Sequence, residues 1–274
     1  MIKLYILLII SIINTSFKPI NYKYISPKIE TIKILGERCS GTNFISALIE
    51  RNLVFKDNLT DLGIYGHKHF IWWIGSGIED RTISSMKGNG YYFDPKNFFF
   101  QNSEKNLFII IIRNPYDWIR SWYLQPHHID PSKKTSFVKF FSTPYKFYKS
   151  YDSDDVAYLE DYHPELKRGF ENLFELRKYK YLNYEKLFTI VDNVCFVNYE
   201  QVLLNPEDFI TFLAQTYSLE KKENFEEITT YKGSGKPFKP KLYFRVTTLD
   251  FKRINNLIDW DVEKRFGYSQ LINN

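Results

Sequence analysis

The sequence predicts an α/β fold, a three-layer sandwich in which helices flank a central parallel sheet. From about residue 30 onward, apolar runs alternate with helical stretches, which is typical of this fold class. Residues 109–112 are four consecutive isoleucines, and this lack of polar alternation indicates a strand that is buried on both faces. A chain of 274 residues that is 44% apolar is long enough for one large domain with a packed core.

The N-terminus carries a short apolar stretch. Lys3 precedes the apolar residues 4–13, which have the length of a signal-peptide core and fall short of the ~20 residues of a membrane span. We therefore expect residues 1–29 to be a signal or anchor segment with its leader, and residues 30–274 to form the domain. This expectation favours the lumen of the secretory pathway or membrane association through residues 4–13. A hydrophobic leading strand in a cytoplasmic protein is the alternative.

The domain elements are expected in a regular order. The first strand, at residues 31–35, runs into a glycine-rich loop and a helix over residues 43–53. The strongest strand, at residues 107–112, ends at Arg113-Asn114-Pro115 and is followed by a helix over residues 116–124. The remaining expected elements are a strand at 193–197, a helix over 206–217, a last helix over 248–265, and a helical and loop insertion around 142–183.

The segment GERCSGTN, residues 36–43, has the glycine spacing of a phosphate-binding loop between a strand and a helix. Backbone N–H groups and the helix N-terminus in such a loop bind anions. The lysine that normally follows the second glycine is replaced by Thr42, and no acidic strand end is apparent for Mg²⁺. A P-loop-like fold that holds a nucleotide 5'-phosphosulfate, without a metal, fits this loop, because the hydroxyls of Ser40 and Thr42 assist the N–H groups.

A second motif, RNPYDWIRS, occupies residues 113–121. Arg113 ends the central strand, and open α/β sheets bind ligands at the carboxyl ends of their strands. Ser121 lies on the following helix. The two side chains together are expected to bind a second phosphate, with the arginine as the charged fork.

These motifs resemble those of the sulfotransferases that use 3'-phosphoadenosine 5'-phosphosulfate (PAPS). The similarity includes Ser40-Gly41-Thr42, residues 113–121, the segment VNYE at 197–200, and a Lys-Gly pair in the basic loop YKGSGKPFKPK, residues 231–241. It runs from about residue 31 to 268, with the middle third unmatched. The resemblance implies PAPS as co-substrate. The residues it implies for the nucleotide are Arg38, Cys39, Ser40, Gly41, Thr42 and Asn43 at the 5'-phosphosulfate, Arg113 and Ser121 at the 3'-phosphate, Tyr199 near the adenine, and Lys232 and Gly233 in the loop that closes over it.

One position departs from the family pattern. Most members have a lysine or arginine directly before Ser-Gly-Thr, where it assists the departing phosphate, but this chain has Cys39. Arg38, one residue earlier, and Lys68 are the candidate replacements.

Sulfuryl transfer also benefits from a base that removes the acceptor proton. Family members commonly use a histidine after the second strand, and the segment GIYGHKHF, residues 63–70, lies at the corresponding distance. His69, next to Lys68, is the favoured base, and His67 is the second candidate.

The sequence thus predicts a sulfotransferase that moves a sulfuryl group from PAPS to a hydroxyl or amine of a carbohydrate, protein tyrosine or small molecule. A P-loop kinase or NTPase and a catalytically inactive nucleotide-binding relative are the alternatives. The net charge of +5 is small and dispersed, so a nucleic-acid partner is not expected. No Cys/His spacing resembles a zinc site, and both cysteines are expected to be free thiols.

Overall fold

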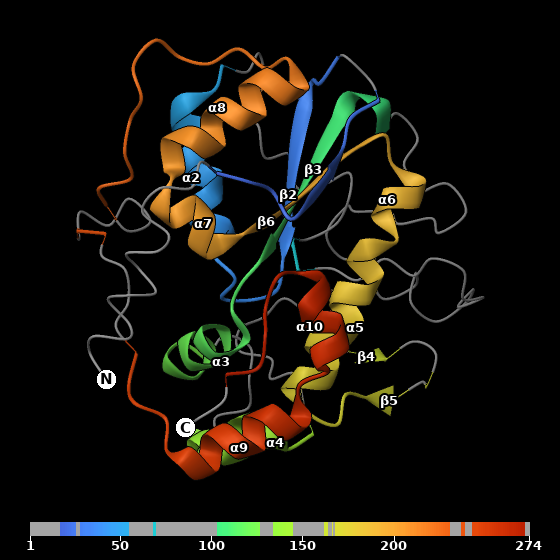
Figure 1. Ribbon diagram of the computed structural model, residues 1–274, viewed down its shortest axis with the longest axis vertical. Helices are drawn as coiled ribbons and strands as arrows, with labels where there is room; N and C mark the ends of the chain where they lie inside the picture. Colours follow the sequence, from blue (N-terminus) through green and yellow to red (C-terminus); the bar gives the residue numbers. More distant parts are fainter. Residues whose placement is uncertain are drawn as a thin grey trace, which may run out of the picture.

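The computed structural model is a mixed α/β protein built on a four-stranded, mostly parallel sheet (Figure 1). It describes residues 17–25, 28–54, 68–69, 103–126, 134–144, 162–163, 166, 168–230, 237–238 and 243–271. The sheet has the order β1-β6-β3-β2, in which β2, β3 and β6 are parallel and β1 is antiparallel to β6. Its strands are β1 (Asn21–Lys23), β2 (Thr31–Gly36), β3 (Asn106–Ile112) and β6 (Asn193–Asn198). A separate antiparallel pair consists of β4 (Tyr162–His163) and β5 (Arg168–Gly169).

Helices cover both faces of the sheet (Figure 1). On one face lie α2 (Thr42–Asn52), α7 (Tyr199–Leu204) and α8 (Pro206–Tyr217). On the other lie α5 (Leu173–Glu185), α6 (Leu187–Ile190) and α10 (Trp260–Arg265). A 3-10 turn, η2 (Ser103–Lys105), precedes β3, and the remaining helices are α3 (Pro115–Leu124), α4 (Phe137–Ser142) and α9 (Thr248–Leu257).

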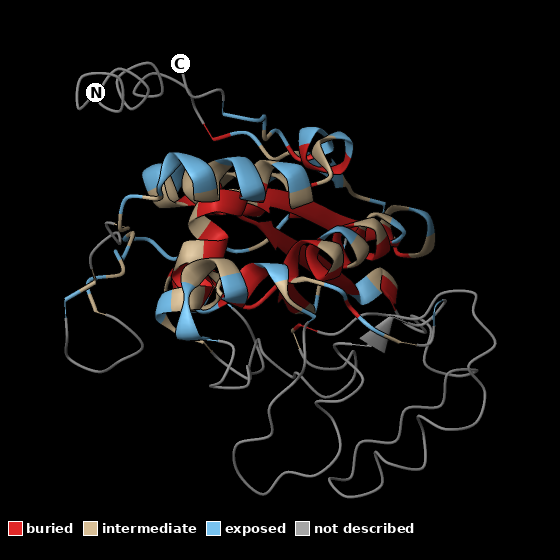
Figure 2. Ribbon diagram, turned by 90° about the horizontal axis from the view of Figure 1, so that it is seen from below, coloured by how far each residue is buried: buried red, intermediate tan, exposed pale blue. Residues whose placement is uncertain are grey.

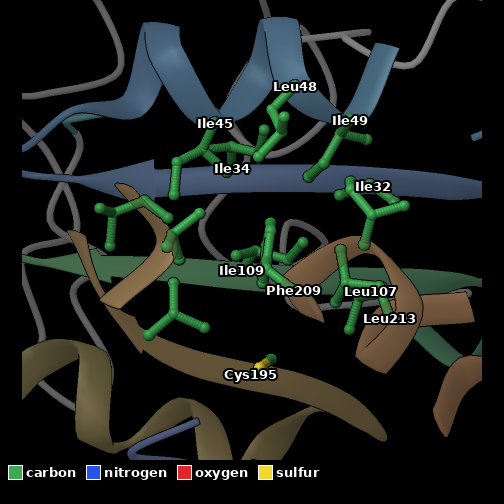
Figure 3. Close-up of a cluster of buried hydrophobic side chains, with 14 of the residues drawn as sticks. Ile32, Ile34, Ile45, Leu48, Ile49, Leu107, Ile109, Cys195, Phe209 and Leu213 are labelled. Atoms are coloured by element: carbon green, nitrogen blue, oxygen red, sulfur yellow. The ribbon is translucent and has the colours of Figure 1, made fainter. Parts of the chain in front are cut away.

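The core follows from the apolar sequence of β3, every residue of which is buried. Because side chains alternate along a strand, Ile109 and Ile111 face α2 and α8, whereas Ile110 and Ile112 face α5 and α6. Figure 2 shows the buried strands between helices whose outer surfaces are exposed, and Figure 3 shows the first of these two clusters at close range. The strands therefore have hydrophobic neighbours on both faces, as a central parallel strand requires.

A third apolar cluster packs α3 and α4 against α5 and α9. The start of α3 is set locally, because the side chain of Asn114 accepts hydrogen bonds from the N–H groups of Tyr116 and Asp117 and Pro115 occupies the first helical position. Burial of Trp118 and Trp122 then fixes the orientation of this helix. The cluster holds the segment after β3 in place beside the sheet.

The three strands expected at residues 31–35, 107–112 and 193–197 are confirmed, as are the helices that follow them. The single helix expected over residues 248–265 is wrong. The chain forms α9 and α10 instead, because Ile258 is extended and buried and the side chain of Asp259 accepts hydrogen bonds from the N–H groups of Asp261 and Val262. This aspartate is an N-cap that starts a new helix.

Two segments contribute to the core beyond the expected outline. β1 lies within residues 1–29, and Phe17 packs against Phe209 of α8 with ring centroids 5.1 Å apart. The folded unit therefore includes Phe17 and β1. α5 occupies the end of the segment expected as an insertion, and its residues Tyr181 and Tyr184 pack against the sheet.

Candidate functional site

The candidate site lies at the carboxyl ends of β2 and β3. These strands are parallel neighbours, with Gly36 opposite Ile111, so the loops that follow them leave the same edge of the sheet. The two sequence motifs meet there, because Nη1 of Arg113 donates a hydrogen bond to the carbonyl oxygen of Cys39 at 2.7 Å. The glycine loop and the arginine motif are thus parts of one surface.

The glycine loop requires glycine at two positions. Gly41 has φ 104°, in the left-handed region, and an added Cβ would lie 2.2 Å from Cδ2 of Tyr199. At Gly36, an added Cβ would lie 2.6 Å from Oγ of Ser40 and 2.9 Å from the carbonyl oxygen of Ile111. The loop can therefore run close to both the strand and the tyrosine ring, and α2 begins directly after it, so that the first N–H groups of the helix lie at the loop.

Two buried polar groups of this surface have no hydrogen-bond partner among the described residues. They are Oγ of Ser40, in the loop, and Nε of Arg113. Ser40 is fully buried and Arg113 is 8% exposed. Leaving a buried donor unpaired costs about 1–3 kcal/mol, and more when the group is charged. Such groups are expected where a polar ligand completes the hydrogen bonding.

Arg113 and Ser121 both act on the hydroxyl of Tyr243. Nη2 of Arg113 donates a hydrogen bond to its oxygen, and Ser121 lowers the pKa of the same hydroxyl. The guanidinium also lies over the ring of Tyr199, 4.5 Å from its centroid. Burial lowers the pKa of Arg113, but Tyr243, Tyr199 and Glu200 raise it and the net shift is upward, so the side chain stays charged.

The backbone around Arg113 is held by two charged side chains, Arg177 and Glu200. Nη2 of Arg177 donates to the carbonyl oxygen of Arg113 at 2.6 Å, and Arg177 itself makes two hydrogen bonds with Glu263, at 2.5 and 2.9 Å. The N–H of Asn114 donates to Oε1 of Glu200 at 2.9 Å. Burial raises the pKa of Glu200, although its hydrogen bonds lower it in part. These contacts fix the direction in which the arginine leaves β3.

Lys68 and His69 lie beside the end of β2. The N–H of Gly36 donates to the carbonyl oxygen of Lys68 at 3.0 Å, and Nζ of Lys68 donates to the side-chain oxygen of Asn43 in the first turn of α2. Nδ1 of His69 lies 2.6 Å from the carbonyl oxygen of Gly36. A carbonyl only accepts, so Nδ1 carries the proton and Nε2 is the acceptor of the neutral ring.

Arg38 is directed into the core. Its guanidinium lies 3.4 Å from the carboxylate of Glu37 and over the ring of Trp122, and its side chain is 2% exposed. Glu37 also pairs with the fully buried Lys180 of α5 at 2.7 Å. Of the two cations considered as replacements at the loop, Lys68 is the one whose ammonium group contacts the first turn of α2.

Thr42 is buried at the start of α2, and Cys39 has φ 62°. Cys39 and Cys195 are both free thiols. His67, Lys232 and Gly233 lie outside the described residues.

Sequence reasoning missed Tyr243 and the residues behind the loop, Arg177, Lys180 and Glu263. Tyr243 follows the basic loop without any motif spacing, and only its contact with Arg113 identifies it. The sequence held a weak signal for Arg177, Lys180 and Glu263, because a charged residue on an otherwise apolar helix face needs a partner of opposite charge.

No family model matches this chain, and no curated protein matches it. Within the described ranges, no helix is long and apolar enough to cross a membrane. Over the same part of the chain, no group of three or more His, Cys, Asp or Glu side chains is arranged to hold a metal ion.

Proposed function

We propose that this chain is a PAPS-dependent sulfotransferase with a P-loop NTPase-like, three-layer α/β fold. The observation that carries the proposal is the hydrogen bond between Arg113 and the carbonyl oxygen of Cys39, which joins the two motifs. An adenosine that bears phosphate groups at both its 5' and 3' positions needs two adjacent anion sites, and the loop and the arginine supply them at neighbouring strand ends.

The loop is the proposed site of the 5'-phosphosulfate. Ser40, Thr42 and the N–H groups at the start of α2 are the donors, and the partial positive charge of the helix N-terminus favours an anion there. Arg113 and Ser121 are the proposed donors to the 3'-phosphate. Tyr199, whose ring lies next to both Gly41 and Arg113, is the proposed neighbour of the adenine.

His69 is the proposed general base. With Nδ1–H directed at the carbonyl of Gly36, the ring presents Nε2 as the atom that accepts the proton of the acceptor hydroxyl. The acceptor oxygen then forms a bond to sulfur as the bond from sulfur to the phosphate oxygen breaks, and the electron pair of that bond leaves with the phosphate. Lys68, at the first turn of α2, is the proposed cation that stabilises this negative charge.

One observation favours a second candidate, a nucleotide-binding protein without turnover. Arg38, which would replace the missing basic residue at Cys39, is paired with Glu37 in the core. Lys68 then remains as the candidate cation. Its substitution distinguishes a sulfotransferase from a nucleotide-binding protein without turnover. If the second candidate is correct, the chain binds the nucleotide but transfers no sulfuryl group to any acceptor.

Calorimetric titration with 3'-phosphoadenosine 5'-phosphate (PAP), AMP and ATP–Mg²⁺ tests the proposal. We expect the wild-type protein to prefer PAP. Truncating one partner of a buried, charge-assisted hydrogen bond costs about 2–5 kcal/mol, so Arg113→Ala should weaken PAP binding by at least about thirtyfold and leave AMP binding nearly unchanged. Arg51→Ala, which removes a partly exposed arginine paired with Glu226, is the control.

Equal losses for PAP and AMP in Arg113→Ala would remove Arg113 from this role. A wild-type preference for ATP–Mg²⁺ would support a kinase or NTPase instead. Once PAP binding is established, a panel of carbohydrates, tyrosine peptides and small phenols with labelled PAPS identifies the acceptor class.

A further inference from the structure

Tyr243 occupies the place where Arg113 and Ser121 converge. Its hydroxyl oxygen accepts a hydrogen bond from Nη2 of Arg113, and Ser121 lowers the pKa of the same hydroxyl. These are the two side chains proposed to bind the 3'-phosphate. A protein oxygen therefore lies at the position proposed for a phosphate oxygen.

The tyrosine is held there by a second arginine. The guanidinium of Arg113 lies 5.5 Å from the centroid of the tyrosine ring, and that of Arg120 lies 5.1 Å from it. Arg120 also donates from Nη1 to the carbonyl oxygen of Phe244 at 3.2 Å and pairs with Asp117. Burial raises the pKa of Tyr243, whereas Arg113 and Ser121 lower it, and the net shift is upward. The hydroxyl is thus neutral at physiological pH.

A single neutral oxygen satisfies Arg113 incompletely. Nη1 is used by the carbonyl of Cys39 and Nη2 by Tyr243, but the buried Nε has no hydrogen-bond partner among the described residues. The Nε and Nη2 groups form one edge of the guanidinium, and this edge binds two oxygens of a phosphate side by side. A phosphate would therefore pair the donor that the hydroxyl leaves unpaired and would place a negative charge in direct contact with the guanidinium.

We propose that Tyr243 is a specificity-determining residue, whose hydroxyl fills the 3'-phosphate position until a phosphate displaces it. The inference rests on the proposed function and names a residue that sets its selectivity. A ribose with a free 3'-hydroxyl offers neither charge nor a second oxygen, so it leaves the tyrosine in place. A 3'-phosphate offers both, and displaces it. The competition therefore lowers the affinity for 3'-phosphorylated nucleotides and leaves the affinity for nucleotides with a free 3'-hydroxyl unchanged, so it limits the preference of the site for the former.

Titration of Tyr243→Phe with PAP and AMP tests this inference. The variant keeps the ring between the two arginines and removes only the competing oxygen. If the tyrosine hydroxyl must leave the site before the ligand binds, the apparent affinity is the intrinsic affinity multiplied by the fraction of molecules in which the site is vacant. We expect the variant to bind PAP about tenfold more tightly than the wild type and AMP within about twofold of it. Tyr116→Phe, which removes a hydroxyl of α3 that donates a hydrogen bond to Asn255 of α9, should leave both affinities unchanged.

Unchanged or weaker PAP binding in Tyr243→Phe would overturn the inference. Unchanged binding would mean that the hydroxyl has no effect on affinity, and weaker binding would mean that it contacts the ligand. A wild-type protein that does not distinguish PAP from AMP would instead contradict the proposed function. Inorganic sulfate separates the two cases, because it needs only the arginine site. Tyr243→Phe should bind sulfate more tightly than the wild type whatever the nucleotide, and equal sulfate affinities would also overturn the inference.

Discussion

The buried ion pair between Arg177 and Glu263 gives the sharpest prediction about stability. The side chains are 1% and 4% exposed and are joined by two hydrogen bonds, so each charge depends on the other. Glu263→Gln keeps the shape of the side chain and removes its charge, leaving the arginine buried and uncompensated. Removing one partner of a buried pair costs about 3–5 kcal/mol. At roughly 2–4 °C for each kcal/mol in a domain of this size, we expect the melting temperature to fall by roughly 10 °C.

The control is a second pair between the same two helices. Glu185 of α5 and Arg265 of α10 lie 2.8 Å apart, but their side chains are 28% and 53% exposed. Glu185→Gln should change the free energy of unfolding by less than about 1 kcal/mol, because water screens an exposed pair. Urea denaturation of both variants, followed by circular dichroism, measures the difference. If the two variants lose equal free energy of unfolding, or if Glu263→Gln loses less than about 1 kcal/mol, then burial does not make this ion pair more important than the exposed one.

Three further predictions concern single residues. Gly41 has φ 104° and lies against a tyrosine ring, so Gly41→Ala should abolish PAP binding in calorimetry. Gly267 has φ 83° and open space around it, so Gly267→Ala should lower the free energy of unfolding in urea only by the backbone strain of about 1–2 kcal/mol. His69→Gln should reduce the rate of sulfuryl transfer by about 10²- to 10⁴-fold and leave PAP affinity intact, as measured with labelled PAPS; an equal loss of affinity would contradict its role as base. The pKa of Asp259 is lowered from 3.8, first by its hydrogen bond with Lys178, so its contribution to stability is present above that pH and is lost as the pH falls through the lower folded-state value. The stability difference between wild type and Asp259→Asn should therefore shrink on acidification from pH 6 to about pH 3 in urea titrations.

The sheet could be predicted because its signals are local. Four consecutive isoleucines have one stable environment, a strand covered on both faces, and Asn114-Pro115 is a helix start that needs no tertiary contact. The meeting of the two motifs also followed from topology, since both come directly after neighbouring parallel strands. Residues at such positions are brought together by the fold itself.

The remaining features depend on contacts between distant segments. Arg38 and Lys68 were equivalent cations in the sequence, and only the pairing of Arg38 with Glu37 inside the core distinguishes them. Tyr243 is far from Arg113 in sequence, so no spacing rule connects them. The helix expected over residues 248–265 contains Asp259, but the structure shows this residue as the N-cap at which α10 begins.

The position of β1 has a consequence for how the chain folds. β1 leaves the ribosome long before β6, its partner among the described strands, with Asn21 opposite Phe196. It must wait until most of the chain has been synthesised, and pairings of such long range slow folding. Until then the ring of Phe17 lacks the surface of α8 that buries it, so this apolar side chain is exposed on the nascent chain.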